Sequence, residues 1–203
     1  ELEDKLAREG KEDLLKRVTH VRNSANIISI RQKQALGLGH AVKCGQPIVG
    51  KDPFAVLLGD EITMGFNGEP NVTSQLVSAF EENGISTISV MKVEDHDVSK
   101  YGIAEIENEK GAIFKVTSLI EKPQLHETKS RWALPGRYVF DNTILDILEN
   151  AKPGKNGEIQ LTDSMKVLCQ EKGLNAMTFT AVRFDAGDKL GYLQANIELG
   201  LKR

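Results

Sequence analysis

The chain has 203 residues and a formal net charge of −3 at pH 7, and 40% of its residues are hydrophobic while 27% are charged. This composition is typical of a folded globular domain and excludes a disordered or fibrous protein. Its basic residues are scattered, and no apolar run reaches the roughly 18 residues of a membrane span, so we expect neither nucleic acid nor a membrane as a partner. The two cysteines, Cys44 and Cys169, lack the spacing of a metal or redox site, and we therefore expect a cytoplasmic protein.

The first third of the chain predicts helices followed by a strand, a loop, a helix and a second strand. Apolar residues at helical spacing over 2–18, interrupted by Gly10, predict two short helices or one kinked helix. The β-branched run 26–31 predicts a buried strand, and 37–44 predicts a helix that opens on glycine. The apolar run 54–58 is typical of a parallel strand whose carboxyl end emerges at a ligand site.

The remaining two thirds of the chain continue the alternation of helices and strands and add one antiparallel hairpin. This hairpin is predicted over 102–106 and 113–120, on either side of a polar turn. Further helices are predicted over 72–82, 142–150, 159–170 and 190–201, and further strands over 85–93, 132–140 and 176–184. The pattern predicts an α/β fold with a mixed, mainly parallel sheet that is flanked by helices.

Two residues that follow the first predicted strand are candidates for recognising a nucleotide. The amide of Gln32 can donate and accept, as recognition of a nucleobase edge requires. A glutamine in a solvated loop, with no binding role, would look the same in the sequence. Gly37 opens a helix, where backbone N–H groups let a ligand approach, and it could equally be a simple turn glycine. The stretch 37–42 lacks the third glycine of a dinucleotide fingerprint, which excludes a Rossmann dinucleotide site.

Two aspartates that follow predicted strands are candidate metal ligands. Asp60 follows 54–58 after Gly59, and Asp185 comes directly after 176–184. Mg²⁺ prefers one or two carboxylates together with substrate phosphates, which both residues could supply. Asp60 could instead be a turn or cap residue, and Asp188 competes with Asp185 as the residue that caps the last helix.

A glutamate and a lysine at the end of the predicted hairpin form a candidate site for a sugar phosphate. Glu121 offers an acceptor and Lys122 a cation, but neighbouring strand residues point to opposite faces. Both can reach one ligand only if Pro123 bends the chain; otherwise they form an exposed ion pair. Glu158, at the start of a later helix, could accept from sugar hydroxyls or serve the helix dipole.

Five stretches in this order closely resemble the bacterial UTP–glucose-1-phosphate uridylyltransferases: Gln32 with 37–42, then 121–123, 136–139, 157–163 and 185–192. The resemblance covers essentially the whole chain. It implies a nucleotide-diphospho-sugar transferase fold and Mg²⁺-dependent transfer of a uridylyl group from UTP to glucose-1-phosphate, giving UDP-glucose and pyrophosphate. It also implies a homodimer or a homotetramer.

The same resemblance assigns roles to single residues. It implies that Gln32 and the backbone of Gly37 read uracil, and that Asp60 and Asp185 hold Mg²⁺ and act in catalysis. It implies that Lys122 binds the phosphate of glucose-1-phosphate as a third catalytic residue. The sugar pocket would be formed by Gly102, Glu121, Gly136 and Glu158, with Glu121 binding glucose hydroxyls.

The chain departs from the family pattern at two places. No stretch matches the N-terminal strand and the Gly-rich loop, with its arginine and downstream lysine, that wrap the triphosphate. We therefore expect 1–203 to be a single nucleotidyltransferase domain without that segment, inactive alone and part of a longer protein. In addition, Gly59 stands where proline is expected, and Glu61 adds a carboxylate that either adjusts metal binding or faces water.

Two other functions fit the same residues. A thymidylyl- or cytidylyltransferase on this fold would differ only in its base pocket, which a nucleotide-competition assay separates. A sugar-nucleotide-binding module that does not catalyse transfer would bind UDP-glucose without turnover.

Overall fold

The computed structural model describes residues 1–65, 68 and 70–201, and the chain forms two compact units, 1–31 and 32–203. The first unit is a pair of helices, α1 (Leu2–Arg8) and α2 (Glu12–Ser24), separated by Gly10 with φ of 67°. This confirms the expected break at that glycine. None of the helices in the described part of the chain is long and apolar enough to cross a membrane.

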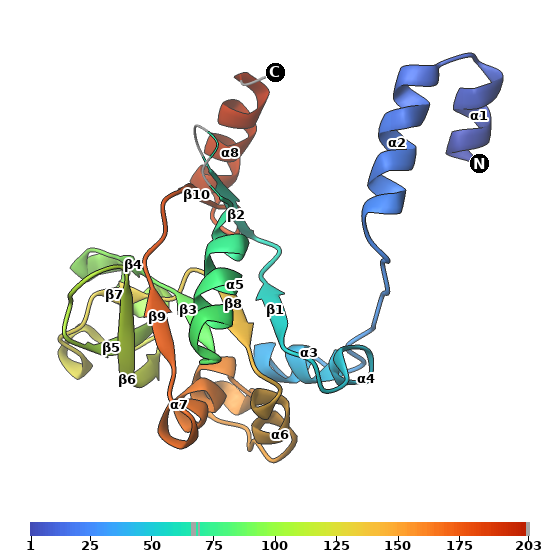
Figure 1. Ribbon diagram of the computed structural model, residues 1–203. Helices are drawn as coiled ribbons and strands as arrows, with labels where there is room; N and C mark the ends of the chain where they lie inside the picture. Colours follow the sequence, from blue (N-terminus) through green and yellow to red (C-terminus); the bar gives the residue numbers. More distant parts are fainter. Residues whose placement is uncertain (66–67, 69, 202–203) are drawn as a thin grey trace. The chain divides into compact units, whose positions relative to one another are not determined.

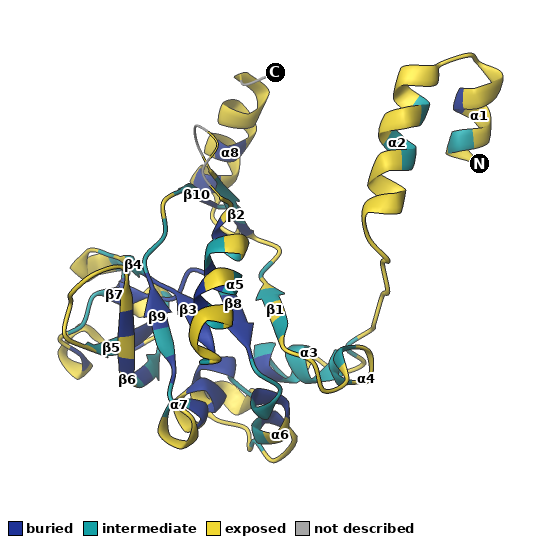
Figure 2. Cartoon of the chain, viewed as in Figure 1, coloured by how far each residue is buried: buried dark blue, intermediate teal, exposed yellow. Residues whose placement is uncertain are grey.

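The β-branched segment 26–31 forms no strand, so the expectation of a buried strand there is wrong. Its side chains are exposed, Ile27 by 85% and Ile28 by 60%, and Figure 2 shows the segment in the colour of exposed residues. A β-branched sequence favours extended backbone, but a strand also needs a neighbour for its hydrogen bonds. Among the described residues, no strand pairs with this segment.

The second unit contains an eight-stranded sheet in the order β1-β8-β3-β9-β6-β5-β7-β4 and a two-stranded sheet of β10 and β2 (Figure 1). The strands of the large sheet are β1 (Phe54–Leu57), β3 (Thr87–Ser89), β4 (Met91–Lys92), β5 (Gly102–Glu107), β6 (Ile113–Glu121), β7 (Trp132–Ala133), β8 (Arg137–Phe140) and β9 (Asn175–Met177). The small sheet pairs β2 (Glu61–Met64) with β10 (Val182–Asp185).

The large sheet is mixed, as expected, but mostly antiparallel rather than mainly parallel. The pair β3–β9 is parallel, and β1 lies antiparallel to β8. The difference arises because β8 lies between β1 and β3 and is antiparallel to both. In addition, three predicted strands each break in two: 85–93 into β3 and β4, 132–140 into β7 and β8, and 176–184 into β9 and β10. The last break places β9 and β10 in different sheets, whereas the hairpin of β5 and β6 forms as predicted.

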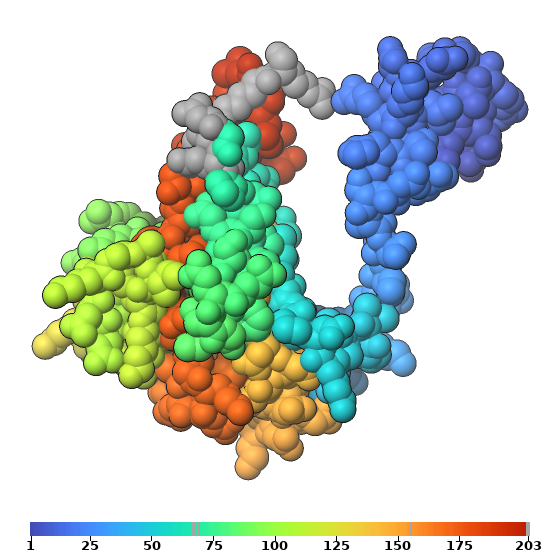
Figure 3. Space-filling view, in the orientation of Figure 1, coloured from blue at the N-terminus to red at the C-terminus, as the bar shows by residue number. Residues whose placement is uncertain are grey.

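The helices of the second unit lie close to their predicted positions. Their bounds are α3 (Leu38–Cys44), α4 (Gln46–Val49), α5 (Val72–Asn83), α6 (Thr143–Glu149), α7 (Leu161–Glu171) and α8 (Lys189–Leu201), with 3₁₀ turns η1 (Asp95–Lys100), η2 (Leu125–Glu127) and η3 (Lys155–Gly157). In Figure 3, α5 forms a green ridge between the β5–β6 hairpin and β1.

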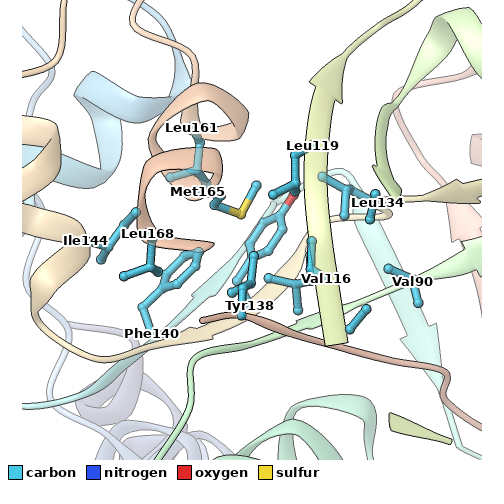
Figure 4. Packing of buried hydrophobic residues seen from close by; sticks show 14 of the residues in the cluster. Val90, Val116, Leu119, Leu134, Tyr138, Phe140, Ile144, Leu161, Met165 and Leu168 are labelled. Carbon is cyan, nitrogen blue, oxygen red and sulfur yellow. The ribbon is translucent and has the colours of Figure 1, made fainter. Parts of the chain in front are cut away.

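The main core lies where α7 covers the large sheet. Leu161, Met165 and Leu168 recur at helical spacing along α7 and are at most 1% exposed. Figure 4 shows Met165 and Leu168 facing the rings of Tyr138 and Phe140 on β8, which stack at a centroid distance of 5.6 Å. This packing fixes the start of α7 against the sheet, next to the pocket described below.

Shortening Leu168 should destabilise the core by more than shortening its neighbour Val167, which is 37% exposed. We expect Leu168→Ala to lower the free energy of unfolding by about 2–5 kcal/mol, because it leaves a cavity in a closely packed core. Val167→Ala should cost under about 1 kcal/mol. Urea unfolding followed by the fluorescence of the single tryptophan, Trp132, measures both, and equal losses would contradict the packing described here.

Candidate functional site

A pocket of about 250 Å³ opens between the large sheet, the small sheet and the start of α7. Its lining brings together five of the residues that the sequence proposed from separate segments: Asp60, Gly102, Glu121, Lys122 and Asp185. The other lining residues are Leu38, Leu58, Glu61, Lys100, Tyr101, Leu134, Pro135, Tyr138, Gln160, Leu161, Thr162 and Arg183.

The two aspartates converge at one edge of the pocket. Asp185 is the last residue of β10 and lies opposite Glu61, the residue that follows Asp60. The amide of Ala186 donates to the Asp60 carbonyl at 2.7 Å. A Cβ placed on Gly187 would lie 3.1 Å from Asp185 Oδ1 and 3.2 Å from Asp60 Oδ2, so one point is close to both carboxylates. Two convergent carboxylates beside an open pocket fit the donor set that Mg²⁺ takes up together with substrate phosphates.

The guanidinium of Arg183 links the two strands of the small sheet. Its Nε donates to both carboxylate oxygens of Glu61, at 2.8 and 3.0 Å, and its Nη2 donates to Asp185 Oδ2 at 3.0 Å. Its Nη1 donates to the hydroxyl of Tyr101 at 3.2 Å, and that hydroxyl donates to the same Asp185 oxygen at 3.0 Å. The orientation of the Asp185 carboxylate is therefore set by two neighbouring side chains.

These contacts give Glu61 and Asp185 different pKa values. Glu61 is only 4% exposed, and burial raises its pKa to about 7, with Arg183 offsetting part of the shift. Glu61 therefore does not face water. Burial alone would also raise the pKa of Asp185, but the hydrogen bond from Tyr101 and the charge of Arg183 together hold it below its usual value. Asp185 is thus ionised at neutral pH, as a metal ligand must be.

The competing aspartate, Asp188, has a separate task. Its Oδ2 accepts from the amides of Leu190 at 3.0 Å and Gly191 at 3.1 Å. Both amides belong to the first turn of α8, where N–H groups lack partners within the helix. Asp188 therefore caps α8, while Asp185 faces the pocket.

Glu121 and Lys122 reach the same pocket because the chain turns between them. Glu121 ends β6 opposite Gly102 on β5, and Lys122 has a φ of 43°, in the left-handed region that few residues adopt. The expected bend is therefore present, and it begins at Lys122, before Pro123. The amide of Lys122 donates to the carbonyl of Tyr101 at 3.2 Å, which holds this turn against the start of β5.

Gln32 and Gly37 lie together beside the pocket, next to the lining residue Leu38. Gln32 Nε2 donates to the Gly37 carbonyl at 3.1 Å and lies 2.9 Å from His40 Nδ1. Gly37 has a φ of 99°, and a Cβ there would lie 2.8 Å from the Ile159 carbonyl. The loop therefore requires glycine at this position, and the amide of Gln32 is held by the start of α3.

Glu158 and Gly136 contact residues that line the pocket. Glu158 Oε2 accepts from Nε2 of Gln160 at 2.9 Å. The amide of Leu58 donates to the Gly136 carbonyl at 3.0 Å, and a Cβ on Gly136 would lie 2.8 Å from Cδ1 of Leu58. Gly136 thus packs against Leu58, a residue of the pocket wall.

Reasoning from the sequence missed several polar residues of the pocket, among them Tyr101, Tyr138, Thr162 and Arg183. Thr162 donates to Glu121 Oε2 at 2.6 Å. Tyr138 is 4% exposed, and burial, together with nearby carboxylates including Glu121, raises its pKa, so its hydroxyl stays protonated. The signal that could have found them is their place beside residues considered above: Gly102, Gly136, Asp163 and Asp185.

Glu61 should make the stability of the fold decrease as the pH rises. Its pKa of about 7 in the folded protein lies above its ordinary value of 4.5, so the folded state keeps a proton that the unfolded chain has released. The resulting stabilisation is present at low pH and is lost as the pH rises through 7, by at most about 3 kcal/mol. We expect Glu61→Gln to remove this decrease in urea unfolding at pH 5 and pH 8. The same pH dependence in both proteins would show that Glu61 does not cause it.

The chain is similar to known nucleotidyl transferases over most of its length. Residues 5–200 match the family model described as nucleotidyl transferase. A UTP–glucose-1-phosphate uridylyltransferase of Bacillus subtilis is 40% identical over 203 residues, which are 100% of this chain and 67% of that protein. A UDP-glucose pyrophosphorylase solved with UDP-glucose is 33% identical with a TM-score of 0.89, over 96% of this chain and 74% of the other.

A UTP-bound UGPase from Acinetobacter baumannii is 36% identical with a TM-score of 0.88, over 100% of this chain and 70% of the other. Matches of this extent in both sequence and fold show the family and confirm the resemblance inferred from the five stretches. The chain therefore belongs to the nucleotidyl transferase family, in its UTP–glucose-1-phosphate uridylyltransferase branch.

Proposed function

We propose that this protein transfers a uridylyl group from UTP to glucose-1-phosphate in a Mg²⁺-dependent reaction, releasing UDP-glucose and pyrophosphate. The observation that carries the proposal is a pocket whose lining includes Asp60, Asp185, Glu121 and Lys122. The solved relatives with UTP and with UDP-glucose support the choice of nucleotide and sugar. We also propose a cytoplasmic location, which the cysteine pattern predicts, and a homodimer or homotetramer, which the family resemblance implies.

Asp60 and Asp185 would hold the metal, and neighbouring side chains fix the orientation of Asp185. Mg²⁺ bound there would neutralise charge on the nucleotide and sugar phosphates and orient them. Asp185 offers a carboxylate that is ionised at neutral pH and fixed by Arg183 and Tyr101. Asp60, the residue before β2, offers Oδ2 near Oδ1 of Asp185, because a Cβ on Gly187 would lie 3.2 Å from the first oxygen and 3.1 Å from the second.

The chemistry requires positioning rather than proton transfer. A phosphate oxygen of glucose-1-phosphate attacks the α-phosphorus of UTP, and the bond from that phosphorus to the bridging oxygen of the β-phosphate breaks as pyrophosphate leaves. This nucleophile is already ionised at neutral pH, so no general base is needed. Lys122 would hold the sugar phosphate by its charge, and Glu121 would accept from glucose hydroxyls, which aligns the attacking oxygen.

The base would be read beside the pocket, where Gln32 and Gly37 lie. The backbone of Gly37 begins α3 and has no side chain to block a nearby ligand, while Gln32 is held against it at 3.1 Å. Gly102, Gly136 and Glu158 would shape the sugar pocket through the residues that they contact. A fixed amide at this position suits recognition of the polar edge of uracil.

UDP-glucose binding by the 203-residue chain tests this proposal without requiring turnover. We expect calorimetry to detect binding in the presence of Mg²⁺. We expect pyrophosphate release from UTP and glucose-1-phosphate only when the chain is preceded by the N-terminal segment of a related uridylyltransferase. Binding without turnover in that extended protein would favour a non-catalytic module, and absence of binding would refute the proposed site.

Asp60→Asn in the extended protein should lower turnover by about 100-fold or more, because a neutral amide holds Mg²⁺ poorly where charge develops. Asp188→Asn is a matched control, since Asp188 caps α8 and asparagine caps about as well. We expect the control to stay within about threefold of the wild type. Unchanged turnover after Asp60→Asn would remove the metal role of this residue.

Competition among nucleotides separates the proposed reaction from its nearest rival on the same fold. Thymine differs from uracil by one methyl group, which a close-fitting pocket discriminates by roughly 10–200-fold. We expect dTTP and CTP to compete poorly against UTP in pyrophosphate release with glucose-1-phosphate. Preference for either of them would assign the chain to the thymidylyl- or cytidylyltransferases.

A further inference from the structure

The carboxylate of Glu121 is held by one hydroxyl group. Thr162, the second residue of α7, donates from Oγ1 to Glu121 Oε2 at 2.6 Å, and Thr162 is only 6% exposed. A hydrogen bond from a buried hydroxyl to a carboxylate is stronger than one between neutral groups and is short in the way seen here. The start of α7 is itself fixed by the buried packing of Leu161 and Met165.

The backbone of Gly102 packs against this pair. A Cβ on Gly102 would lie 3.0 Å from Thr162 Oγ1, 3.2 Å from Glu121 Oε2 and 2.9 Å from Leu134 Cδ1. The hydroxyl and the carboxylate oxygen therefore occupy the space that any side chain at this position would take. Because Gly102 pairs with Glu121 across β5 and β6, the sheet and the helix hold the carboxylate from two sides.

The other oxygen of Glu121 is in a different situation. Oε2 is bonded to Thr162, whereas within the described part of the chain no hydrogen bond to Oε1 is found. The side chain of Glu121 lines the pocket beside Lys122. One oxygen thus anchors the group, and the second remains available to a ligand.

We propose that Thr162 is a positioning residue for sugar recognition, which fixes the Glu121 carboxylate so that its second oxygen meets a sugar hydroxyl. This inference rests on the proposed function, because it takes Glu121 as the residue that binds the sugar. A glutamate without such an anchor samples several rotamers, and a ligand must then restrict it on binding. Because Thr162 already restricts the Glu121 side chain, the ligand does not have to restrict it on binding.

Binding of UDP-glucose and of UDP, compared by calorimetry with Mg²⁺, tests the role of Thr162. Thr162→Val keeps the shape of the side chain but removes the hydroxyl, and we expect it to weaken UDP-glucose binding by about 10-fold while UDP binding stays within twofold. Thr162→Ser restores the hydroxyl and should recover most of the affinity for UDP-glucose.

The chain offers a matched control in Thr128. It is also 6% exposed, and its hydroxyl donates to a glutamate, Glu105 Oε1, at 3.2 Å, but neither residue lines the pocket. Thr128→Val should leave the affinities for both UDP-glucose and UDP unchanged. A loss that is specific to Thr162→Val and to the sugar nucleotide would support the positioning role.

Three other outcomes would overturn it. Wild-type affinity for UDP-glucose in Thr162→Val would show that the hydroxyl does not matter. Equal losses for UDP-glucose and UDP, unrecovered by serine, would show general disruption of the site. A wild-type protein that binds UDP-glucose no better than UDP would instead refute the proposed role of Glu121, and the role of Thr162 with it.

Discussion

The orientation of the Asp185 carboxylate depends on the guanidinium of Arg183, which binds both Glu61 and Asp185 on the two strands of the small sheet. The charge of Arg183 lowers the pKa of both carboxyl groups against the effect of burial. Without Arg183, Glu61 and Asp185 would lose a hydrogen-bond donor, and burial would raise both pKa values further. The pair β2–β10 therefore needs Arg183 as much for its own stability as for the orientation of Asp185.

The same network attaches the small sheet to the large one. Arg137, on β8 of the large sheet, donates from Nη2 to the backbone carbonyl of Glu61 at 2.9 Å and from Nε to Thr63 at 3.1 Å. Tyr101, directly before β5, contacts both Asp185 and Arg183. Of the residues that line the pocket, Gly102 and Glu121 belong to the large sheet, and Asp185 belongs to the small one. These contacts consequently set the distance between the two halves of the pocket.

Local patterns in the sequence predicted the helices and the hairpin, because glycines and apolar spacing are local signals, whereas the family resemblance implied that Asp60 and Asp185 converge. The sequence did not reveal where 132–140 and 176–184 break, since the neighbours that a strand finds in the fold decide its length. For the same reason 26–31, with its β-branched residues, was misjudged. Arg183 and Thr162 were missed because each lies inside an element, and only the fold brings it to a carboxylate.

Two carboxylates that line the pocket are anchored in the same way. Asp185 Oδ2 accepts from Arg183 and Tyr101, and Glu121 Oε2 accepts from Thr162. Each is thereby held by a side chain from a rigid strand or helix. A reaction whose nucleophile is already ionised gains little from a general base and much from groups that need not reorganise when substrates bind. The arrangement is thus suited to catalysis by positioning of the substrates, for which the fixed orientation of a carboxylate matters as much as its charge.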